Sequence, residues 1–470
     1  MRRVAVFALA AVALLFLGLP PVLGMLTESQ VASRVAALDA SGVVKASLRS
    51  YKRSWFRSRA RITIAIAPQF IARLDALGAV GGMTSFAGTL DRRVPIEIEI
   101  AHGPLAILDG VHFGWSKVVA RLDRQSGGVA ALERTLAVPY VFEFRGRTDF
   151  AGRVAFDAEM PPVDFSIEGA RVEFSGAALA GTFAAGRLVS NGHFERFELT
   201  SPPGGFAIRN VRAATDTEVR SAVALPGDAS LSIERISIVD AARGPMPVFA
   251  ADNVRIASKI GLDPNEALLN LHATSDMDSV FVDGTRVTGA SLGVAIEKLD
   301  TVALEAYLEA AHAEANGPAP KLALKPALER ALRAGPSLVL DPVRLRVNEE
   351  PFTARVEVTE NPAALPPTGK FDPEDPAALL PSLRSVATID VSKKLAREIA
   401  VTATEQRYGG DDSLPPQERR LLAEAQAGLM LVMLVGQGIL EDAGDTYRAE
   451  IRLTDGALTL NGAALPFGLP

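Results

Sequence analysis

Apolar and polar side chains alternate along most of the chain between residues 43 and 292. Residues Arg61–Ile66 alternate Arg, Thr and Ala with isoleucines, and Ile96–Ile100 alternate isoleucine with glutamate. A period of two places one kind of side chain on each face of a strand, which is typical of an antiparallel sheet with one buried and one wet face. Turns with Gly, Pro, Asp or Asn separate the strands, and short connections favour a meander.

This alternation predicts strands at Val43–Leu48, Ala60–Ala67, Ile96–Ile100, Tyr140–Arg145, Arg153–Phe156, Asp164–Ile167, Arg171–Phe174, His193–Leu199, Phe206–Val211, Leu231–Val239, Val248–Ala257 and Val280–Val287. Beyond residue 292, apolar residues at helical spacing join the strand pattern. They predict helices at Thr301–Ala315, Lys325–Arg333, Lys393–Arg407 and Pro416–Leu440.

The predicted fold is therefore α+β and rich in strands. It is a large, curved antiparallel meander sheet with several C-terminal helices on one face, plus one N-terminal transmembrane helix. Composition divides the chain into a membrane segment (1–26), a β-rich region (27–296) and a mixed region that packs on the sheet (297–470). Because all four helices lie in the last region, we expect the apolar face of the sheet to be covered only in part.

The last predicted helix has an unusual end. Residues 425–440 carry no charge, and Gly428–Val435 is apolar on every side. A helix that is apolar all round is normally buried or in lipid. The segment is short for a membrane span, so the pattern favours a core helix on the sheet over membrane contact.

The N-terminus predicts a membrane attachment. Arg2 and Arg3 precede the uncharged segment Val4–Leu26, whose 23 residues are enough to cross a bilayer. The alternative is a cleaved signal peptide, but Val22-Leu23-Gly24 is a poor cleavage site and the apolar run is long. The pattern favours a retained anchor over cleavage near residue 24. A short helix, Leu26–Leu38, is expected directly after it.

The charge distribution orients that anchor. The two arginines and the amino group are expected to stay in the cytoplasm, while the rest of a single-pass inner-membrane protein lies in the periplasm. The chain has no cysteine, which removes disulfides, thiolate nucleophiles and cysteine metal sites. Its formal net charge of −6 gives no reason to expect nucleic-acid binding.

The segment Tyr51–Ser58 is basic and aromatic. No acidic residue lies between Asp39 and Asp75, whereas lysines and arginines are frequent there. Trp55 and Phe56 could meet a bilayer interface while arginines bind lipid phosphates. The alternative, which the alternation favours, is a twisted hairpin whose Tyr51 and Phe56 pack in the core and whose arginines are solvated.

No catalytic, metal or cofactor motif is present. The five histidines lack the H-E-x-x-H spacing, and there is no Walker or G-x-G-x-x-G sequence. One G-x-S-x-G sequence occurs, Gly289–Gly293, and it is not read as a nucleophile elbow because no helix is predicted directly after it. His102, which precedes Gly103-Pro104, is read as a turn residue rather than a general base. Carboxylates are numerous, so a glycosidase-type pair stays open as an alternative.

Several of these features together resemble a family. The N-terminal anchor, the Tyr51-x-Arg53-Ser54-x-Phe56-x-Ser58 turn, His102-Gly103-Pro104 and the closing Asp455-Gly456 and Leu458-Thr-Leu460-Asn461-Gly462 occur in the order seen in YdgA-type proteins of Gram-negative bacteria. The resemblance implies an inner-membrane-anchored periplasmic protein with a domain of unknown function. Ser54 departs from the glycine usual there. The candidate interface residues are Tyr51, Arg53, Trp55, Phe56, Ser58, His102, Gly103 and Pro104.

Two functions from different classes follow. The first is a non-enzymatic envelope protein that offers an apolar sheet face to lipid or to an envelope protein partner, with the inner membrane contacted through residues 4–26. The second is a hydrolase of an envelope polymer with a dispersed acidic site. The absence of any catalytic signature favours the first, with no cofactor.

Overall fold

The computed structural model describes residues 28–66, 93–220, 225–314, 325–367, 379–408 and 416–465, apart from short interruptions. The chain divides into two compact units. Unit 1 holds residues 1–202, 210–219 and 311–319, and unit 2 holds residues 203–209, 220–310 and 320–470. Strand β13 (Gly204–Glu218) contributes to both units. The boundary expected after residue 296, between the β-rich region and the mixed region, stays a prediction.

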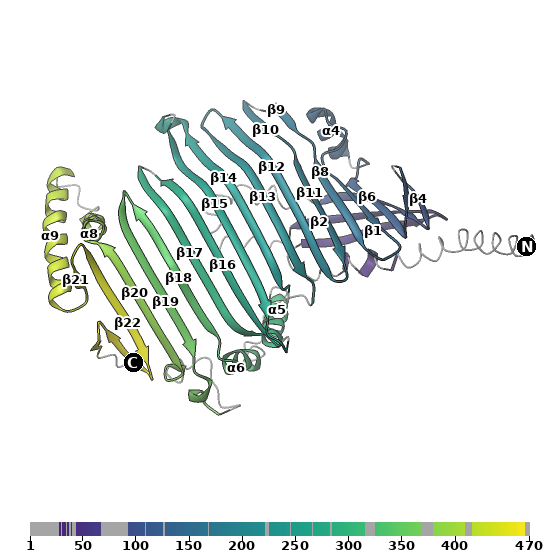
Figure 1. Ribbon diagram of the computed structural model, residues 1–470. Coiled ribbons are helices and arrows are strands. Elements are labelled where there is room, and N and C mark those ends of the chain that lie inside the picture. The colour runs from purple at the N-terminus through teal and green to yellow at the C-terminus, as the bar shows by residue number, and fades with distance from the viewer. Residues whose placement is uncertain are drawn as a thin grey trace, which may run out of the picture. The chain divides into compact units, whose positions relative to one another are not determined.

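Unit 1 is an antiparallel sheet (Figure 1). Its strands pair in the order β1–β2–β3–β6–β7–β8–β11–β12, and β9 and β10 continue β8 and β11 with β10 also paired to β12. The elements are β1 Val44–Arg53, β2 Arg57–Ile66, β3 Val94–His102, β4 Leu105–Ile107, β5 Val111–Phe113, β6 Ser116–Leu122, α4 Gly127–Leu136, β7 Glu143–Thr148, β8 Val154–Met160, β9 Val163–Ile167, β10 Ala170–Phe174, β11 Ala177–Ala184 and β12 Arg187–Ser201.

One face of the unit 1 sheet is apolar. Ile62 pairs with Leu48 on one side and Ile96 on the other, so the three side chains share a face. Val35, from the residues that precede β1, packs there with Ala46 and Ile62 in a buried cluster. Helical residues are present between 28 and 39, which agrees with the short helix expected before the first strand.

The opposite face of unit 1 carries cross-strand ion pairs. Arg59 on β2 contacts both Glu97 and Glu99 on β3. Further along the sheet, Glu143 on β7 lies between Arg121 and Arg145 and is only 1% exposed. Alternation of charge with isoleucine and phenylalanine therefore produces two chemically different faces.

Unit 2 is also an antiparallel meander, in the order β14–β15–β16–β17–β18–β19–β20–β22–β23–β24, with the short β21 also on β22. Figure 1 shows its long strands side by side. The elements are β14 Gly227–Asp240, η1 Ala241–Arg243, β15 Pro247–Leu262, β16 Leu268–Val282, β17 Thr285–Asp300, α5 Thr301–Glu314, α6 Lys325–Arg333, β18 Ser337–Val347, β19 Glu350–Glu360, η3 Pro362–Ala364, β20 Leu383–Ser392, α8 Lys393–Tyr408, α9 Pro416–Gly436, β21 Glu441–Ala443, β22 Thr446–Thr454, β23 Ala457–Leu460 and β24 Ala463–Ala464.

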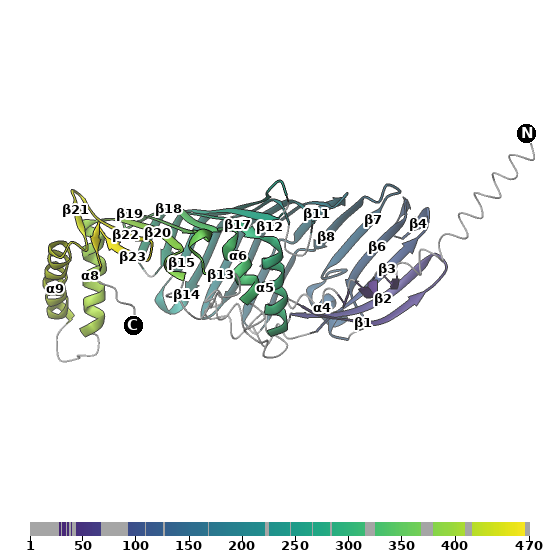
Figure 2. The same ribbon diagram turned by 90° about the horizontal axis from the view of Figure 1, so that it is seen from below.

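The helices of unit 2 are fixed by caps and small residues. Asp300 accepts a hydrogen bond from the backbone N–H of Ala303 at the start of α5, and Arg330 of α6 pairs with the same carboxylate at 2.7 Å. Alanines of α8 and α9 meet in a buried cluster that Val391 and Tyr447 of the sheet join. Figure 2 shows α8 and α9 at one end of this sheet.

Three helices agree closely with the sequence pattern. α6 has the predicted bounds, α5 ends one residue earlier, and α8 ends one residue later. The predicted strand Val280–Val287 is wrong, because the chain turns between β16 and β17 with Gly284 at φ 88°. β7 begins at Glu143 rather than at Tyr140.

The prediction of a core helix on the sheet holds for one side of the last helix only. α9 buries one side, through Ala423, Ala427 and Leu431, against α8. Its other side is wet: Leu429 is 72% exposed and Val432 is 70% exposed. The apolar run therefore packs on one side only, and the helix ends at Gly436.

The described residues contain no helix that is both long and apolar enough to cross a membrane. The expected transmembrane segment, residues 1–26, lies outside the described residues. The structure shows a strand-rich protein with a large antiparallel sheet and a few helices.

The ion-pair face gives a stability prediction. Glu143→Gln should lower the free energy of unfolding of unit 1 by about 1–3 kcal/mol, because it leaves two arginines beside a buried neutral group. Both tryptophans of the chain, Trp55 and Trp115, lie in unit 1, so urea unfolding followed by their fluorescence reports on this unit. The exposed pair Asp164–Arg171 provides the control. Asp164→Asn should shift the midpoint little, since water screens such pairs; equal shifts for both variants would contradict the account.

Candidate functional site

The residues of the family motif come together at one end of unit 1. The register places Arg53 opposite Ser58 across the β1–β2 turn, and Ser58 opposite Ile100 of β3. His102 lies two residues further along β3, on the same face as Ile100. Strand pairing thus joins two motifs that are more than forty residues apart, since Ser58 and His102 are separated by 44 positions.

Tyr51, Ser58 and His102 form a hydrogen-bonded chain. The Ser58 hydroxyl and His102 Nε2 lie 2.7 Å apart, and Ser58 also hydrogen-bonds to the Tyr51 side chain. Ser58 is 3% exposed and His102 is 1% exposed. Burial lowers the pKa of His102, so the imidazole is held neutral. Burial raises the pKa of Tyr51, and its hydrogen bond with Ser58 draws it down in part.

This chain has the residue types of a nucleophile and base but not their arrangement. A nucleophilic serine must reach its substrate, and its histidine needs a group that orients the other ring nitrogen. Ser58 is buried, and His102 Nδ1 has no hydrogen-bond partner among the described residues. The geometry fits a polar clamp that ties three strands together beneath the turn.

The other motif residues shape the surface around the clamp. Gly103 has φ 105°, a conformation that favours glycine, and its N–H donates to the Trp115 carbonyl. With Pro104 it leads the chain from β3 into the β4–β5 hairpin. Trp55 and Phe56 in the β1–β2 turn are exposed, so the expectation that Phe56 packs in the core is wrong.

Unit 2 offers a second candidate, a continuous apolar face. Residues directly opposite one another in a register share a face of the sheet. One such row crosses eight strands: Leu231, Ile256, Ser275, Leu292, Val343, Ala354, Ile389 and Ala449. The next row on the same face is Ala229, Ser258, Ala273, Val294, Leu340, Val356, Ala387, Ile451 and Leu460. We call these two rows the apolar face.

The described helices cover only part of the apolar face: α8 and α9 lie at one end, and α5 and α6 lie on the same side, where α6 contacts β17 (Figure 2). Val391 and Tyr447, which continue it, pack under the α8–α9 cluster. Two residues along the same strand, Ile389 is already 39% exposed. Ile256, Leu292 and Ile451 are exposed to 40–41%. The sequence prediction of partial cover concerns the strands between Ile62 and Phe174, which belong to unit 1, so the exposed rows of unit 2 do not test it.

The reverse side of the same strands is polar. The row Arg255, Asp276, Ser291, Arg344, Thr353, Asp390 and Arg448 runs beside the first apolar row. Arg448 pairs with Asp390 at 2.8 Å, and the Ser291 hydroxyl donates to Asp276 at 2.7 Å. The exposed isoleucines are therefore not part of a uniformly mixed surface.

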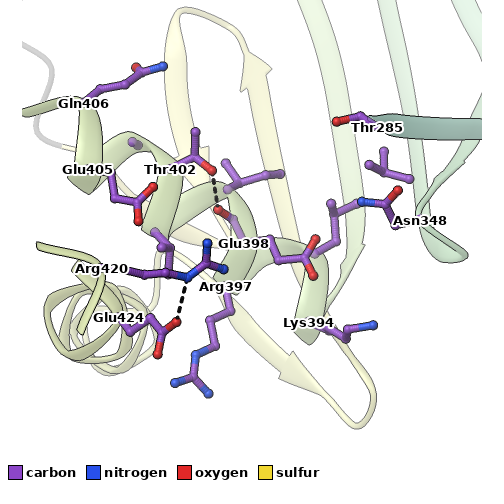
Figure 3. Close-up of a pocket in the computed structure, with 15 residues that line it drawn as sticks. Thr285, Asn348, Lys394, Arg397, Glu398, Thr402, Glu405, Gln406, Arg420 and Glu424 are labelled. Atoms are coloured by element: carbon purple, nitrogen blue, oxygen red, sulfur yellow. Dashed lines mark hydrogen bonds and ion pairs between the residues drawn. The ribbon is translucent and has the colours of Figure 1, made fainter. Parts of the chain in front are cut away.

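A cavity of about 940 Å³ lies beside α8, between this helix, the start of α9 and the strand ends at Thr285 and Asn348 (Figure 3). Its wall carries charges of both signs that pair locally. Arg420 contacts Glu424 at 3.3 Å, and Lys394 binds Glu350 at 3.0 Å. The lining mixes charged side chains with apolar ones such as Leu395, Ile399 and Val401, so this is not a purely apolar pocket.

The described residues give little support to a catalytic site built from carboxylates. Glu360, at the end of β19, is buried, and this burial raises its pKa while the adjacent Ser382 draws it down. One such carboxylate is not the facing pair that a glycosidase needs. Within the described part of the chain, no group of three or more histidine, aspartate or glutamate side chains could hold a metal ion.

The fold and these surfaces define a class of protein: an antiparallel meander with two-faced sheets, one apolar face of which is partly open. The model of a family described as "Bacterial protein of unknown function (DUF945)" matches residues 1–467, and the chain belongs to this family. The chain matches no curated protein and no solved structure.

Sequence reasoning missed part of the surface around the motif. The short β4–β5 hairpin places Ile107, Val111 and Phe113 beside the Trp55 turn, linked by Arg57 Nη2 donating to the Ile107 carbonyl at 2.8 Å. The alternation of Val111, His112 and Phe113 was the available signal. With three residues in each strand, it falls below the length at which a pattern predicts a strand.

The polar clamp predicts an acid-sensitive fold. An unfolded His102 takes up a proton near pH 6.5, whereas the buried side chain does so only at lower pH. Between these values the unfolded chain binds more protons, so the stability of unit 1 should fall as pH drops below about 6.5, by at most about 1.4 kcal/mol per pH unit. His102→Gln should flatten this dependence in urea titrations followed by tryptophan fluorescence.

The exposed His193 of β12 supplies the matched control. His193→Gln should keep the wild-type pH dependence. A His102→Gln protein with an unchanged slope between pH 5 and 7 would show that the clamp does not hold a neutral imidazole.

Proposed function

We propose that this protein is an envelope binding module of the YdgA type rather than an enzyme. In this proposal residues 4–26 hold it in the inner membrane, the remainder lies in the periplasm, and the apolar face of unit 2 binds the acyl chain of a lipid. The uncharged N-terminal segment supports the membrane attachment, and the two arginines before it support the orientation.

One observation carries the lipid proposal: large apolar side chains stand in register across the sheet and stay wet. Fully burying one Leu or Ile side chain is worth about 1.5–3 kcal/mol, and each buried methylene of a ligand about 0.8 kcal/mol. Four side chains that are about two-fifths exposed therefore offer a substantial gain to an apolar ligand. A long, unbranched chain suits a row that runs across many strands.

The chemistry of the surroundings favours an acyl chain over a soluble metabolite. The two rows that form the apolar face contain two side chains with a polar atom, Ser258 and Ser275, and the others are apolar. A polar metabolite would lose its hydration there without gaining hydrogen bonds. The alternative of an envelope-polymer hydrolase has no observation in its favour and is not proposed.

Photocrosslinking tests the lipid site. The full chain, reconstituted in bilayer discs, is irradiated with a diazirine-bearing palmitate, and the adducts are mapped by mass spectrometry. We expect adducts on β15, β17, β20 and β22. Ile389→Gln with Ile451→Gln should lower their yield about tenfold, because two apolar contacts are lost.

The matched control changes the opposite face of the same two strands. Thr388→Gln with Arg452→Gln should leave the adduct yield within about twofold of wild type, since neither residue lies on the apolar face. Adducts confined to the first 40 residues, or an equal loss in both double variants, would contradict the proposal.

The location is tested separately. An alkaline phosphatase fused to the C-terminus should be active in living cells, because this enzyme matures only outside the cytoplasm. A fusion that is inactive while a cytoplasmic reporter at the same position is active would overturn the periplasmic assignment.

A further inference from the structure

A second wet apolar surface lies in unit 1, at the end of the sheet that holds the polar clamp. The β4–β5 hairpin pairs Leu105 with Phe113 and Ile107 with Val111. Directly opposed residues share a face, so these four side chains form one patch. Val111 is 64% exposed and Phe113 is 68% exposed.

The hairpin is not loosely attached. Its other face buries Ala106 and Leu108 against Ala101 of β3 and Val119 of β6. A short two-stranded hairpin is thus held rigidly with its more apolar face turned to water. Contiguous exposed apolar patches of this kind mark interaction or membrane sites.

Trp55 and Phe56 extend the patch. The Phe56 carbonyl accepts a hydrogen bond from the His102 N–H, and Arg57 holds the Ile107 carbonyl. These bonds fix the β1–β2 turn to the hairpin. We call the six exposed residues Trp55, Phe56, Leu105, Ile107, Val111 and Phe113 the tip.

The path of the chain indicates what covers the tip. Glu28 contacts Arg53 at 3.7 Å, at the end of β1 next to the turn. Asp39, eleven positions later, accepts a hydrogen bond from the Ala46 N–H near the start of β1. The chain therefore comes to the sheet from the tip end, and the residues directly before it, 4–26, have the composition of a membrane-spanning segment.

The charge around the tip is also that of a membrane-facing surface. Segments 49–58, 102–117 and 147–153, which make up this end, hold four, one and two basic residues against none, one and one acidic residues. Clusters of Lys and Arg beside a membrane segment are attracted to anionic headgroups. Tryptophan is enriched at the bilayer interface, and both tryptophans of the chain lie here, Trp115 with its Nε1 donating to the Phe150 carbonyl.

We propose that the tip is a membrane-docking surface, which lays the β4–β5 hairpin and the Trp55 turn into the interface of a bilayer with anionic headgroups. Docking would hold unit 1 against the membrane by a second contact beside the N-terminal segment. The proposal does not depend on lipid binding by the apolar face of unit 2.

Tryptophan quenching by brominated lipid tests it. Full-length Trp115→Phe protein, which keeps Trp55, is reconstituted in phosphatidylethanolamine–phosphatidylglycerol vesicles with or without bromine at acyl carbons 6 and 7. We expect the brominated lipid to remove about half or more of the Trp55 emission, since an interfacial side chain reaches the upper acyl region. Iodide in the aqueous phase should quench it weakly.

Two variants make the test specific. In the same background, Ile107→Ser with Phe113→Ser should reduce the quenching by lipid, provided that circular dichroism shows an unchanged fold. As a matched control, Thr200→Trp in a Trp55→Phe/Trp115→Phe chain puts the reporter on an exposed residue at the other end of the unit 1 sheet. It should respond to iodide and not to bromine.

The opposite result is equally clear. Trp55 that is quenched fully by iodide and not at all by brominated lipid would overturn the proposal and leave a protein partner as the occupant of the tip. Crosslinking of palmitate to unit 2 in that same sample would show that the lipid-binding proposal stands without the tip.

Discussion

Successive side chains of an antiparallel strand point to opposite faces of the sheet. When the apolar side chains of neighbouring strands are aligned by the register, one whole face of the sheet is apolar and has to be buried. In unit 2 the rows through Ile256, Leu292 and Ile389 stay in register over many strands. The apolar area thus grows with every strand added, while the described cover comes from α8 and α9 at one end and from α5 and α6 near β17 (Figure 2). The open apolar face follows directly from this imbalance.

The two units meet the same constraint differently. In unit 1 the residues before β1 place Val35 on Ala46 and Ile62, so a short, local segment covers the apolar face at its first strands. Its polar face gains cross-strand ion pairs such as those of Glu143. The apolar residues left in water there include those of the tip, and also Leu179 and Phe183 on β11, which lie on the same face as Phe144. Each unit thus leaves part of its apolar surface exposed.

The sequence predicts local structure well where the pattern is long. The bounds of α6 follow from its apolar spacing and from the Gly335-Pro336 stop. Prediction from the sequence fails where strand pairing between distant segments determines which residues lie together. No local pattern indicates that Ser58 meets His102, or that Phe113 lies near the Trp55 turn. Such prediction also fails in part for α9, because an apolar run shows that a helix needs an apolar environment without saying whether that environment is protein or something else.

The central claim is that the apolar face of unit 2 is open to a ligand, and the absence of cysteine makes a direct measurement possible. The rate at which a maleimide labels Ile389→Cys compares this face with the polar reverse, probed by Thr388→Cys on the same strand. The account predicts that delipidated protein is labelled at both positions, and that palmitate slows the reaction at position 389 alone. Labelling that is slow at position 389 without any lipid would mean that protein covers the face, and this would contradict the account.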